Sequence, residues 1–280
     1  MIDIIESKDQ LGDRMKGYEN VESDRRLDVN LPIYVRIDGR GFSKFTADMD
    51  RPFDKRMSEC MVSATMYLVG RTHARMGYTQ SDEISLVFLA GDKEGSDVFF
   101  NGRVQKLASV LSGMTTVAFL SAVLKTPGFE HYADRMPHFD ARVFQLPSQT
   151  EAANAFLWRE KDAAKNSVSM ACRSNHSHRE MHGKSGREMI EMMGERGLDY
   201  HAMPLSFRRG TWIHRVTTER GLTDEELARI PEDHRPDAST LYQRSEVRSF
   251  TIPDFGSVMN REAVIFDGGD PEVASEVAYA

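Results

Sequence analysis

Three carboxylates, Asp38, Asp82 and Glu83, stand where apolar segments of the chain end or begin. Hard divalent cations such as Mg²⁺ prefer a few carboxylates together with the phosphate oxygens of a substrate. Two such cations held close together activate an attacking oxygen and stabilise a leaving one. The residues therefore predict a metal-dependent site for phosphate chemistry, provided that the fold brings them together. A plainer interpretation stays open, because Asp-Gly is a turn signal and an Asp-Glu pair at a hairpin tip is usually solvated.

Phosphate-binding groups surround this set in the sequence. Gly39 and Gly41 bracket Arg40 directly after Asp38, and glycines let backbone N–H groups approach phosphate oxygens closely. Three further cations could bind phosphate or could equally be ordinary surface charges: Arg36, Lys106 and Arg142.

The segments around these residues predict a ferredoxin-like core. Residues 33–38 alternate with period two, which indicates a strand whose apolar face enters a core while Arg36 and Asp38 point the other way. A helix over 54–76, stopped by Gly77, precedes strands at 78–80 and 84–89, with Asp82 at the tip of their hairpin. A second helix over 101–124 and a strand over 139–146 complete a β-α-β-β-α-β order. Such an antiparallel sheet carries helices on one face, and its other face is open to host a site. Since the first and third strands are neighbours, the carboxylates should converge.

The rest of the chain predicts an extension of this α+β core. A helical region spans 150–196, and strands are expected at 208–216 and 246–252. We therefore divide the chain into a catalytic core, residues 1–148, and a helical and strand extension, residues 149–280, which packs on the core and is not independent.

The amino-acid composition limits the class of protein and the cellular compartment that we expect. Of 280 residues, 40% are hydrophobic and only two are cysteines, which favours a reducing compartment. The N-terminus lacks a signal-peptide pattern, and no stretch is expected to approach the ~20 apolar residues of a membrane span. We expect a soluble, cytoplasmic protein. The net charge is −7, but residues 159–220 carry 12 basic against 8 acidic side chains. This net-basic region indicates either a phosphate-binding face or a solvated helix surface.

Several ordered motifs resemble the tRNA-His guanylyltransferase family, whose members are 3′-to-5′ polymerases that add nucleotides to the 5′ end of RNA. The similarity spans about residues 11 to 216, and the ordered set is more specific than any one motif. The matching segments are Arg36-Ile37-Asp38-Gly39-Arg40-Gly41-Phe42, Gln80-Ser81-Asp82-Glu83, Phe139-Asp140-Ala141-Arg142-Val143, Trp158-Arg159 with Asp162 and Asn166, and Phe207-Arg208-Arg209-Gly210-Thr211.

The resemblance implies a polymerase-like palm and a role for each matching residue. Asp38 and Asp82 would bind two Mg²⁺ ions with help from the Gly39 carbonyl, and Glu83 would support the carboxylates. ATP, GTP or another nucleoside triphosphate would be the substrate. Its site would be lined by Arg36, Asp38, Gly39, Arg40, Gly41, Phe42, Ser43, Ser81, Asp82, Lys106 and Arg142. The basic region would hold the tRNA backbone through Arg159, Lys165, Asn166, Arg208 and Arg209. A homotetramer is implied, because the family builds its RNA site across subunits.

One departure from the family pattern changes the expected substrate. The eukaryotic branch carries a histidine in a His-Ile-Asn-Asn motif where this chain has Ala164. The pattern around Ala164 is more similar to the guanylyltransferase-like proteins of bacteria and archaea, which prefer template-directed repair of 5′-truncated tRNA. We therefore expect such repair. The alternatives are addition of G at position −1 of tRNA-His, a nucleotidyl cyclase, and an RNA-binding protein with an inactive palm.

Overall fold

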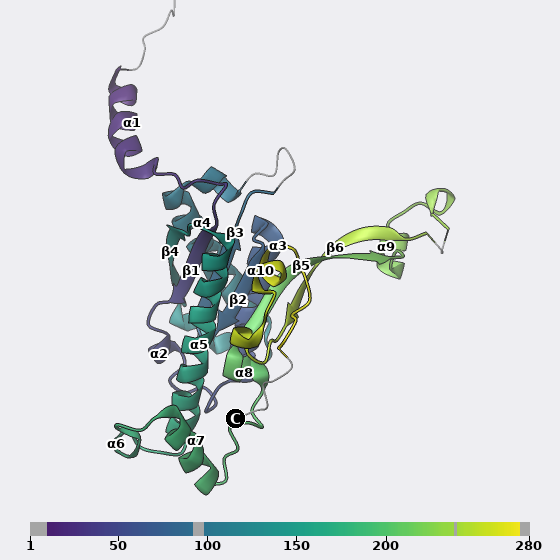
Figure 1. Cartoon of the computed structure of the whole chain (residues 1–280). Coiled ribbons are helices and arrows are strands. Elements are labelled where there is room, and N and C mark those ends of the chain that lie inside the picture. The colour runs from purple at the N-terminus through teal and green to yellow at the C-terminus, as the bar shows by residue number, and fades with distance from the viewer. Residues whose placement is uncertain (1–9, 92–97, 238–239, 275–280) are drawn as a thin grey trace, which may run out of the picture.

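A six-stranded antiparallel sheet with strand order β4-β1-β3-β2-β5-β6 forms the centre of the protein. The structure, a computed structural model, describes residues 10–91, 98–237 and 240–274 (Figure 1). The strands are β1 Ile33–Gly39, β2 Met76–Gln80, β3 Glu83–Phe88, β4 Phe139–Gln145, β5 Thr211–Arg220 and β6 Tyr242–Phe250. The helices are α1 Gln10–Ser23, α2 Phe42–Phe45, α3 Lys55–Thr72, α4 Val104–Lys125, α5 Gln149–Arg173, α6 His178–Met181, α7 Gly186–Glu195, α8 Leu205–Arg209, α9 Asp224–Ala228 and α10 Arg261–Phe266.

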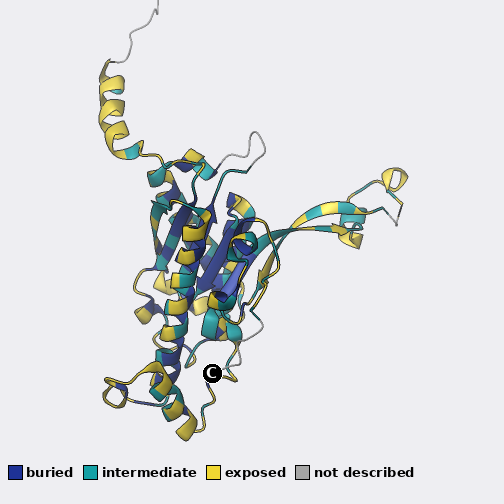
Figure 2. Cartoon of the chain, in the orientation of Figure 1, coloured by how far each residue is buried: buried dark blue, intermediate teal, exposed yellow. Residues whose placement is uncertain are grey.

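The first four strands have the order of a ferredoxin-like sheet, which confirms the predicted α+β palm. One face of β1, made by Ile33, Val35 and Ile37, is fully buried in a core shared with α3 and α4. The period-two alternation of β1 places its polar residues on the opposite face. Figure 2 shows the buried strands between these layers.

The second face of the sheet is not left open. Tyr34 of β1 and Tyr78 of β2 pack there against Phe156 of α5 and against Phe255 and Val264 of the C-terminal segment. Figure 1 shows α5 crossing this face. The extension therefore occupies the face that the core alone would expose. Strand β5 also continues the same sheet by pairing with β2, and β5 and β6 run on together as a two-stranded arm that projects from the body.

Several expected element boundaries are wrong, among them that of β6, expected over 246–252 and observed over Tyr242–Phe250, and two others have a clear cause. Helix α3 ends at Thr72, because His73 takes a left-handed backbone conformation at its C-cap, with φ 58°. Gly77 is then a residue of β2, where a Cβ atom would lie 2.8 Å from Cγ2 of Val69. The strand expected from residue 208 begins only at Thr211, and the two preceding arginines belong to the short helix α8.

The expectation that no segment approaches a membrane span is also wrong by composition. Helix α4 has 22 residues, a mean hydropathy of 1.9 in its most apolar window, and only 28% of that window buried. Its inner residues, which include Leu107, Leu111 and Phe119, are fully buried in the core beneath the sheet. The apolar residues on this side of α4 thus pack the helix layer against the sheet.

Candidate active site

The predicted carboxylates meet at one end of the sheet, on the face that α5 crosses. Asp38 on β1 lies directly opposite Glu83 on β3. On its other side Asp38 lies directly opposite Asp140 on β4. Like charges placed opposite one another in a sheet are destabilising, so a row of three carboxylates needs a compensating cation or a functional reason. Asp140 was not predicted as a site residue, although the period-two pattern of its strand places it on the same face as Arg142.

Asp82 joins this row from the turn between β2 and β3. Gln80 and Glu83 are paired, so Ser81 and Asp82 form a two-residue hairpin turn. Ser81 has φ 55°, a conformation that usually requires glycine. Its hydroxyl donates to Oδ1 of Asp82 over 3.1 Å, and the Asp82 carbonyl accepts from the Gly39 N–H over 3.0 Å. Burial, and then the negative charge of Asp38, raise the pKa of Asp82 above its usual value.

The loop after Asp38 is shaped by its two glycines. A Cβ atom at Gly39 would lie 2.4 Å from the ring of Phe42, and Gly41 has φ 70°. Phe42 itself is buried against Phe45, Phe119 and Phe139. Its side chain therefore anchors the loop in the core, and only its backbone is available for the predicted nucleotide contact. Arg40, Gly41 and Ser43 are exposed.

Glu83 is held by a cation rather than left free. Arg159 on α5 donates to its two carboxylate oxygens over 2.6 and 2.7 Å, and Arg36 Nε lies 3.9 Å from Oε2. Burial raises the pKa of Glu83, and the hydrogen bonds and charge of Arg159 oppose that shift. The structure therefore places Glu83 as the link between the carboxylate row and α5.

The three predicted phosphate-binding cations have different surroundings. Arg36 and Arg142 lie opposite each other on β1 and β4, in the row next to the carboxylates. Arg142 is 54% exposed, with its guanidinium 3.8 Å from Asp140. Lys106 lies in the first turn of α4, which packs on the opposite face of the sheet, and its ammonium group sits 5.8 Å from the ring centroid of Phe100. None of its described contacts reaches the carboxylates.

The residues predicted to bind RNA differ in whether their side chains already have polar partners within the chain. Arg159 and Arg209 are bound inside the chain, Arg209 to the fully buried carboxylate of Glu160 over 2.7 Å. Arg208 donates to the Met203 carbonyl, and Asn166 donates to Asp162. Lys165 is exposed, and its side chain has no polar partner among the residues described, although its carbonyl accepts the Ser169 hydroxyl. Of the five, Lys165 is thus the side chain most available to a phosphate.

The oxygen atoms at this site suit a metal cation that takes some of its coordinating ligands from the substrate. Within the described part of the chain, no three His, Cys, Asp or Glu side chains converge closely enough to hold a metal by themselves. Asp38, Asp82 and the Gly39 carbonyl offer oxygen ligands, whereas Glu83 is occupied by Arg159. Mg²⁺ is commonly bound by one or two carboxylates plus water and phosphate oxygens, so these residues fit Mg²⁺ that arrives with a nucleotide.

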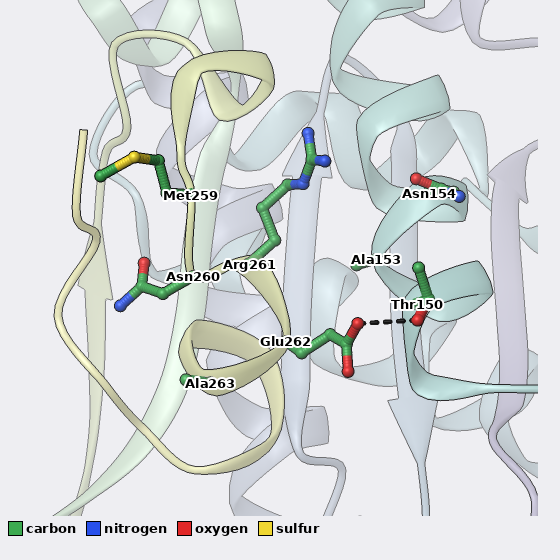
Figure 3. Close-up of a pocket in the computed structure, with 8 residues that line it drawn as sticks. All are labelled: Thr150, Ala153, Asn154, Met259, Asn260, Arg261, Glu262 and Ala263. Atoms are coloured by element: carbon green, nitrogen blue, oxygen red, sulfur yellow. Dashed lines mark hydrogen bonds between the residues drawn. The ribbon is translucent and has the colours of Figure 1, made fainter. Parts of the chain in front are cut away.

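A cavity of about 300 Å³ lies away from the carboxylates, between the start of α5 and α10. Figure 3 shows Glu262 and Thr150 facing each other across it, joined by a 2.7 Å hydrogen bond. Its lining includes Asn154, Asn260 and Arg261 but no predicted site residue. We therefore do not assign the phosphate chemistry to this cavity.

Comparisons with known proteins agree with the geometry. A sequence profile described as tRNAHis guanylyltransferase matches residues 12–147. A bacterial tRNA(His) guanylyltransferase-like protein solved with ATP is 35% identical, with a TM-score of 0.67, and the match covers 74% of this chain and 87% of that chain. A bacterial protein of the same description solved with GTP is 29% identical, with a TM-score of 0.66 and coverages of 86% and 91%. An uncharacterised protein of Acanthamoeba polyphaga mimivirus is 34% identical over 180 residues, which are 56% of this chain and 60% of that protein.

Proposed function

The chain belongs to the tRNA-His guanylyltransferase family, and from that premise we propose that it is a Mg²⁺-dependent 3′-to-5′ nucleotidyltransferase that repairs 5′-truncated tRNA. In this role it adds to the 5′ end the nucleotides that pair with the opposite strand. ATP, GTP and other nucleoside triphosphates are its small substrates. The two solved relatives with bound ATP and GTP support this choice of substrate class.

The convergence of Asp38 and Asp82 carries the proposal. Asp38 comes from β1 and Asp82 from the turn that leads into the neighbouring strand β3, and the two segments are joined by the Gly39 N–H, which donates to the Asp82 carbonyl. This is the arrangement that phosphoryl and nucleotidyl transfer requires, since the protein contributes mainly positioning and charge. Two partly buried carboxylates without a cation partner among the described residues destabilise the fold. An inactive palm would gain nothing that offsets this cost.

In the reaction the 3′-hydroxyl of the incoming nucleotide attacks the 5′ phosphorus of the RNA. A new P–O bond forms as the bond to the leaving group breaks. That group is pyrophosphate from a triphosphorylated end, or a nucleoside monophosphate from an end activated beforehand. Mg²⁺ bound at Asp38 and Asp82 would lower the pKa of the hydroxyl and neutralise charge on the leaving phosphate. Arg36, Arg142 and the backbone N–H groups of residues 41–43 orient the triphosphate, and no side-chain base is required.

The decisive experiment uses labelled tRNA that lacks its first nucleotide, with Mg²⁺ and each nucleoside triphosphate in turn. We expect extension only by the nucleotide complementary to the 3′ strand. Asp82→Asn should reduce the rate by about 10²–10³-fold, because Asp82 would hold the cation that neutralises charge developing in the transition state, and loss of one such electrostatic contact costs about that much. Asp134→Asn, which changes an exposed aspartate outside the site, is the matched control and should keep full activity.

Other outcomes of the same assay select the alternatives. Addition of G whatever the template contains would favour guanylylation of tRNA-His. Conversion of free nucleotide to a cyclic product without RNA would favour a cyclase. If Asp82→Asn left every activity unchanged, the protein would be an RNA-binding protein with an inactive palm.

We further propose that the protein works as a cytoplasmic homotetramer in which the extension, residues 149–280, does not fold alone. Exposed apolar side chains support self-association: Leu11, Met15 and Tyr18 of α1, and Val117 and Leu124 of α4, are 45–68% exposed. Light scattering after size-exclusion chromatography measures the assembly. A monomer at micromolar concentration would remove this part of the proposal.

A further inference from the structure

Arg36 is a largely buried site cation whose side chain makes no hydrogen bond among the described residues. Its side chain is only 19% exposed, yet its buried Nε makes no hydrogen bond. The nearest carboxylate, Glu83, is 3.9 Å away and already accepts two short bonds from Arg159. A largely buried guanidinium is stable only when something else compensates its charge.

Besides Glu83, an aromatic ring on α5 lies beside the Arg36 guanidinium. The guanidinium carbon of Arg36 lies 5.4 Å from the ring centroid of Trp158, and that of Arg159 lies 4.6 Å from the same ring. A cation within about 6 Å of an indole face is attracted by the ring quadrupole, most strongly where water is partly excluded. Trp158 as a residue is 51% exposed, so its position is not explained by burial in the core. An aromatic contact also leaves the N–H donors of an arginine unused.

We propose that Trp158 is a positioning residue that holds Arg36 by a cation–π contact, so that the guanidinium presents its free donors to a phosphate group of the bound nucleotide. The adjacent residue, Arg159, completes the arrangement by keeping Glu83 away from Arg36. Two consecutive residues of helix α5 thus have complementary roles. Arg159 neutralises Glu83, and Trp158 orients the guanidinium of Arg36. This inference rests on the proposed function in one respect, namely that the site takes a nucleotide.

The test measures binding without RNA, by calorimetry with ATP and with inorganic tripolyphosphate. Trp158→Phe keeps a π face and should stay within about threefold of the wild-type affinity. Trp158→Leu keeps an apolar side chain but removes the quadrupole, and should weaken both ligands about tenfold. The same loss should appear in KM for the nucleotide, with kcat changed much less. Circular dichroism and the melting temperature establish that both variants fold.

A double-mutant cycle decides whether Trp158 acts through Arg36. In an Arg36→Ala background, Trp158→Leu should cost nothing further. If it still cost tenfold for ATP but not for tripolyphosphate, the ring would instead stack on the base, and the inference would be overturned. Equal affinities of the Leu variant and the wild type would overturn it as well. Because no RNA is present, failure of tRNA extension would not affect these results.

Fluorescence gives an independent reading. The chain has two tryptophans, and the other, Trp212, is fully buried. Tripolyphosphate that binds Arg36 should change the emission of the wild-type protein, and this change should disappear in Trp158→Phe. A change of undiminished size in Trp158→Phe would come from Trp212 alone and would contradict a ligand-linked contact between Arg36 and Trp158.

Discussion

Arg159 on α5 and Glu83 at the start of β3 form a bidentate ion pair, with N–O distances of 2.6 and 2.7 Å. Both side chains are largely buried, at 12% and 16% exposed. The pair ties the extension to the carboxylate end of the sheet, and we expect Arg159 to act through this contact rather than through the predicted RNA contact.

Arg159→Ala should therefore destabilise the protein by about 3 kcal/mol, because breaking a buried pair leaves an uncompensated carboxylate. Urea unfolding followed by circular dichroism measures this change. Lys161→Ala, two residues along on the same helix and exposed, is the control and should stay within about 0.5 kcal/mol. An Arg159→Ala protein that unfolds like the wild type but loses tRNA affinity would restore the RNA-binding role.

Lys165 and Arg209 should behave oppositely, although both were predicted to bind RNA. Lys165→Ala should weaken tRNA binding at every salt concentration and reduce the slope of log K against log salt by about 1, with no loss of stability. Arg209→Ala should instead cost about 3 kcal/mol in urea unfolding, because it strands the fully buried carboxylate of Glu160. Filter binding at several salt concentrations separates the two. Equal salt slopes for Lys165→Ala and the wild type would place the RNA elsewhere.

The strand order of the core can be predicted from short-range patterns in the sequence. Alternation in residues 33–38 and the hairpin before Ile84 suffice to place Asp38 beside Glu83, because the strand order of a β-α-β-β-α-β unit makes them neighbours. The convergence of these carboxylates was therefore predictable. The end of α3 was not, since His73 takes the left-handed conformation that Gly77 was expected to supply.

Partners from distant parts of the chain could not be read from the sequence. Nothing local indicates that Arg159 reaches Glu83, 76 positions earlier, or that Phe42 turns into the core while its neighbours stay exposed. The sequence alone does not show which basic side chains of residues 159–220 have partners within the chain. Burial on the second face of the sheet pairs Arg159 and Arg209 with carboxylates, whereas the exposed Lys165 side chain has no such partner among the described residues.

The glycine that follows Asp38 provides a test of the loop. Gly39→Ala would put a Cβ atom 2.4 Å from the ring of Phe42, so the ring or the backbone must shift. We expect a loss of about 1–3 kcal/mol, as for other overpacked sites, together with a large loss of activity. Gly113→Ala on α4 is the matched control, because a Cβ atom there meets nothing within 4 Å. It should stabilise the helix by about 0.5–1 kcal/mol. Two variants of equal stability would show that the loop relaxes freely.

Asp82 provides a test of the site's electrostatics. Burial and the charge of Asp38 raise its pKa in the folded protein. A carboxyl whose pKa is higher folded than unfolded costs stability above its unfolded value, near 3.8, and costs nothing well below it. Asp82→Asn, which keeps an acceptor for the Ser81 hydroxyl, should therefore raise the melting temperature by roughly 2 °C at pH 7 in a chelator. That advantage should shrink as the pH falls towards 4.

Adding Mg²⁺ and nucleotide at pH 7 should reverse the order of the two proteins. A ligand that binds only the folded state stabilises it by mass action, so the wild type should gain while Asp82→Asn gains little. Thermal melts with and without Mg²⁺, at pH 7 and pH 4.5, test both effects in one series, with Asp134→Asn as the control. If Asp82→Asn were less stable than the wild type at pH 7 in the chelator, the carboxylate would have a stabilising partner instead of a repulsive neighbour. If Mg²⁺ raised both melting temperatures equally, Asp82 would not be a ligand, and the cation would have to bind through other oxygens.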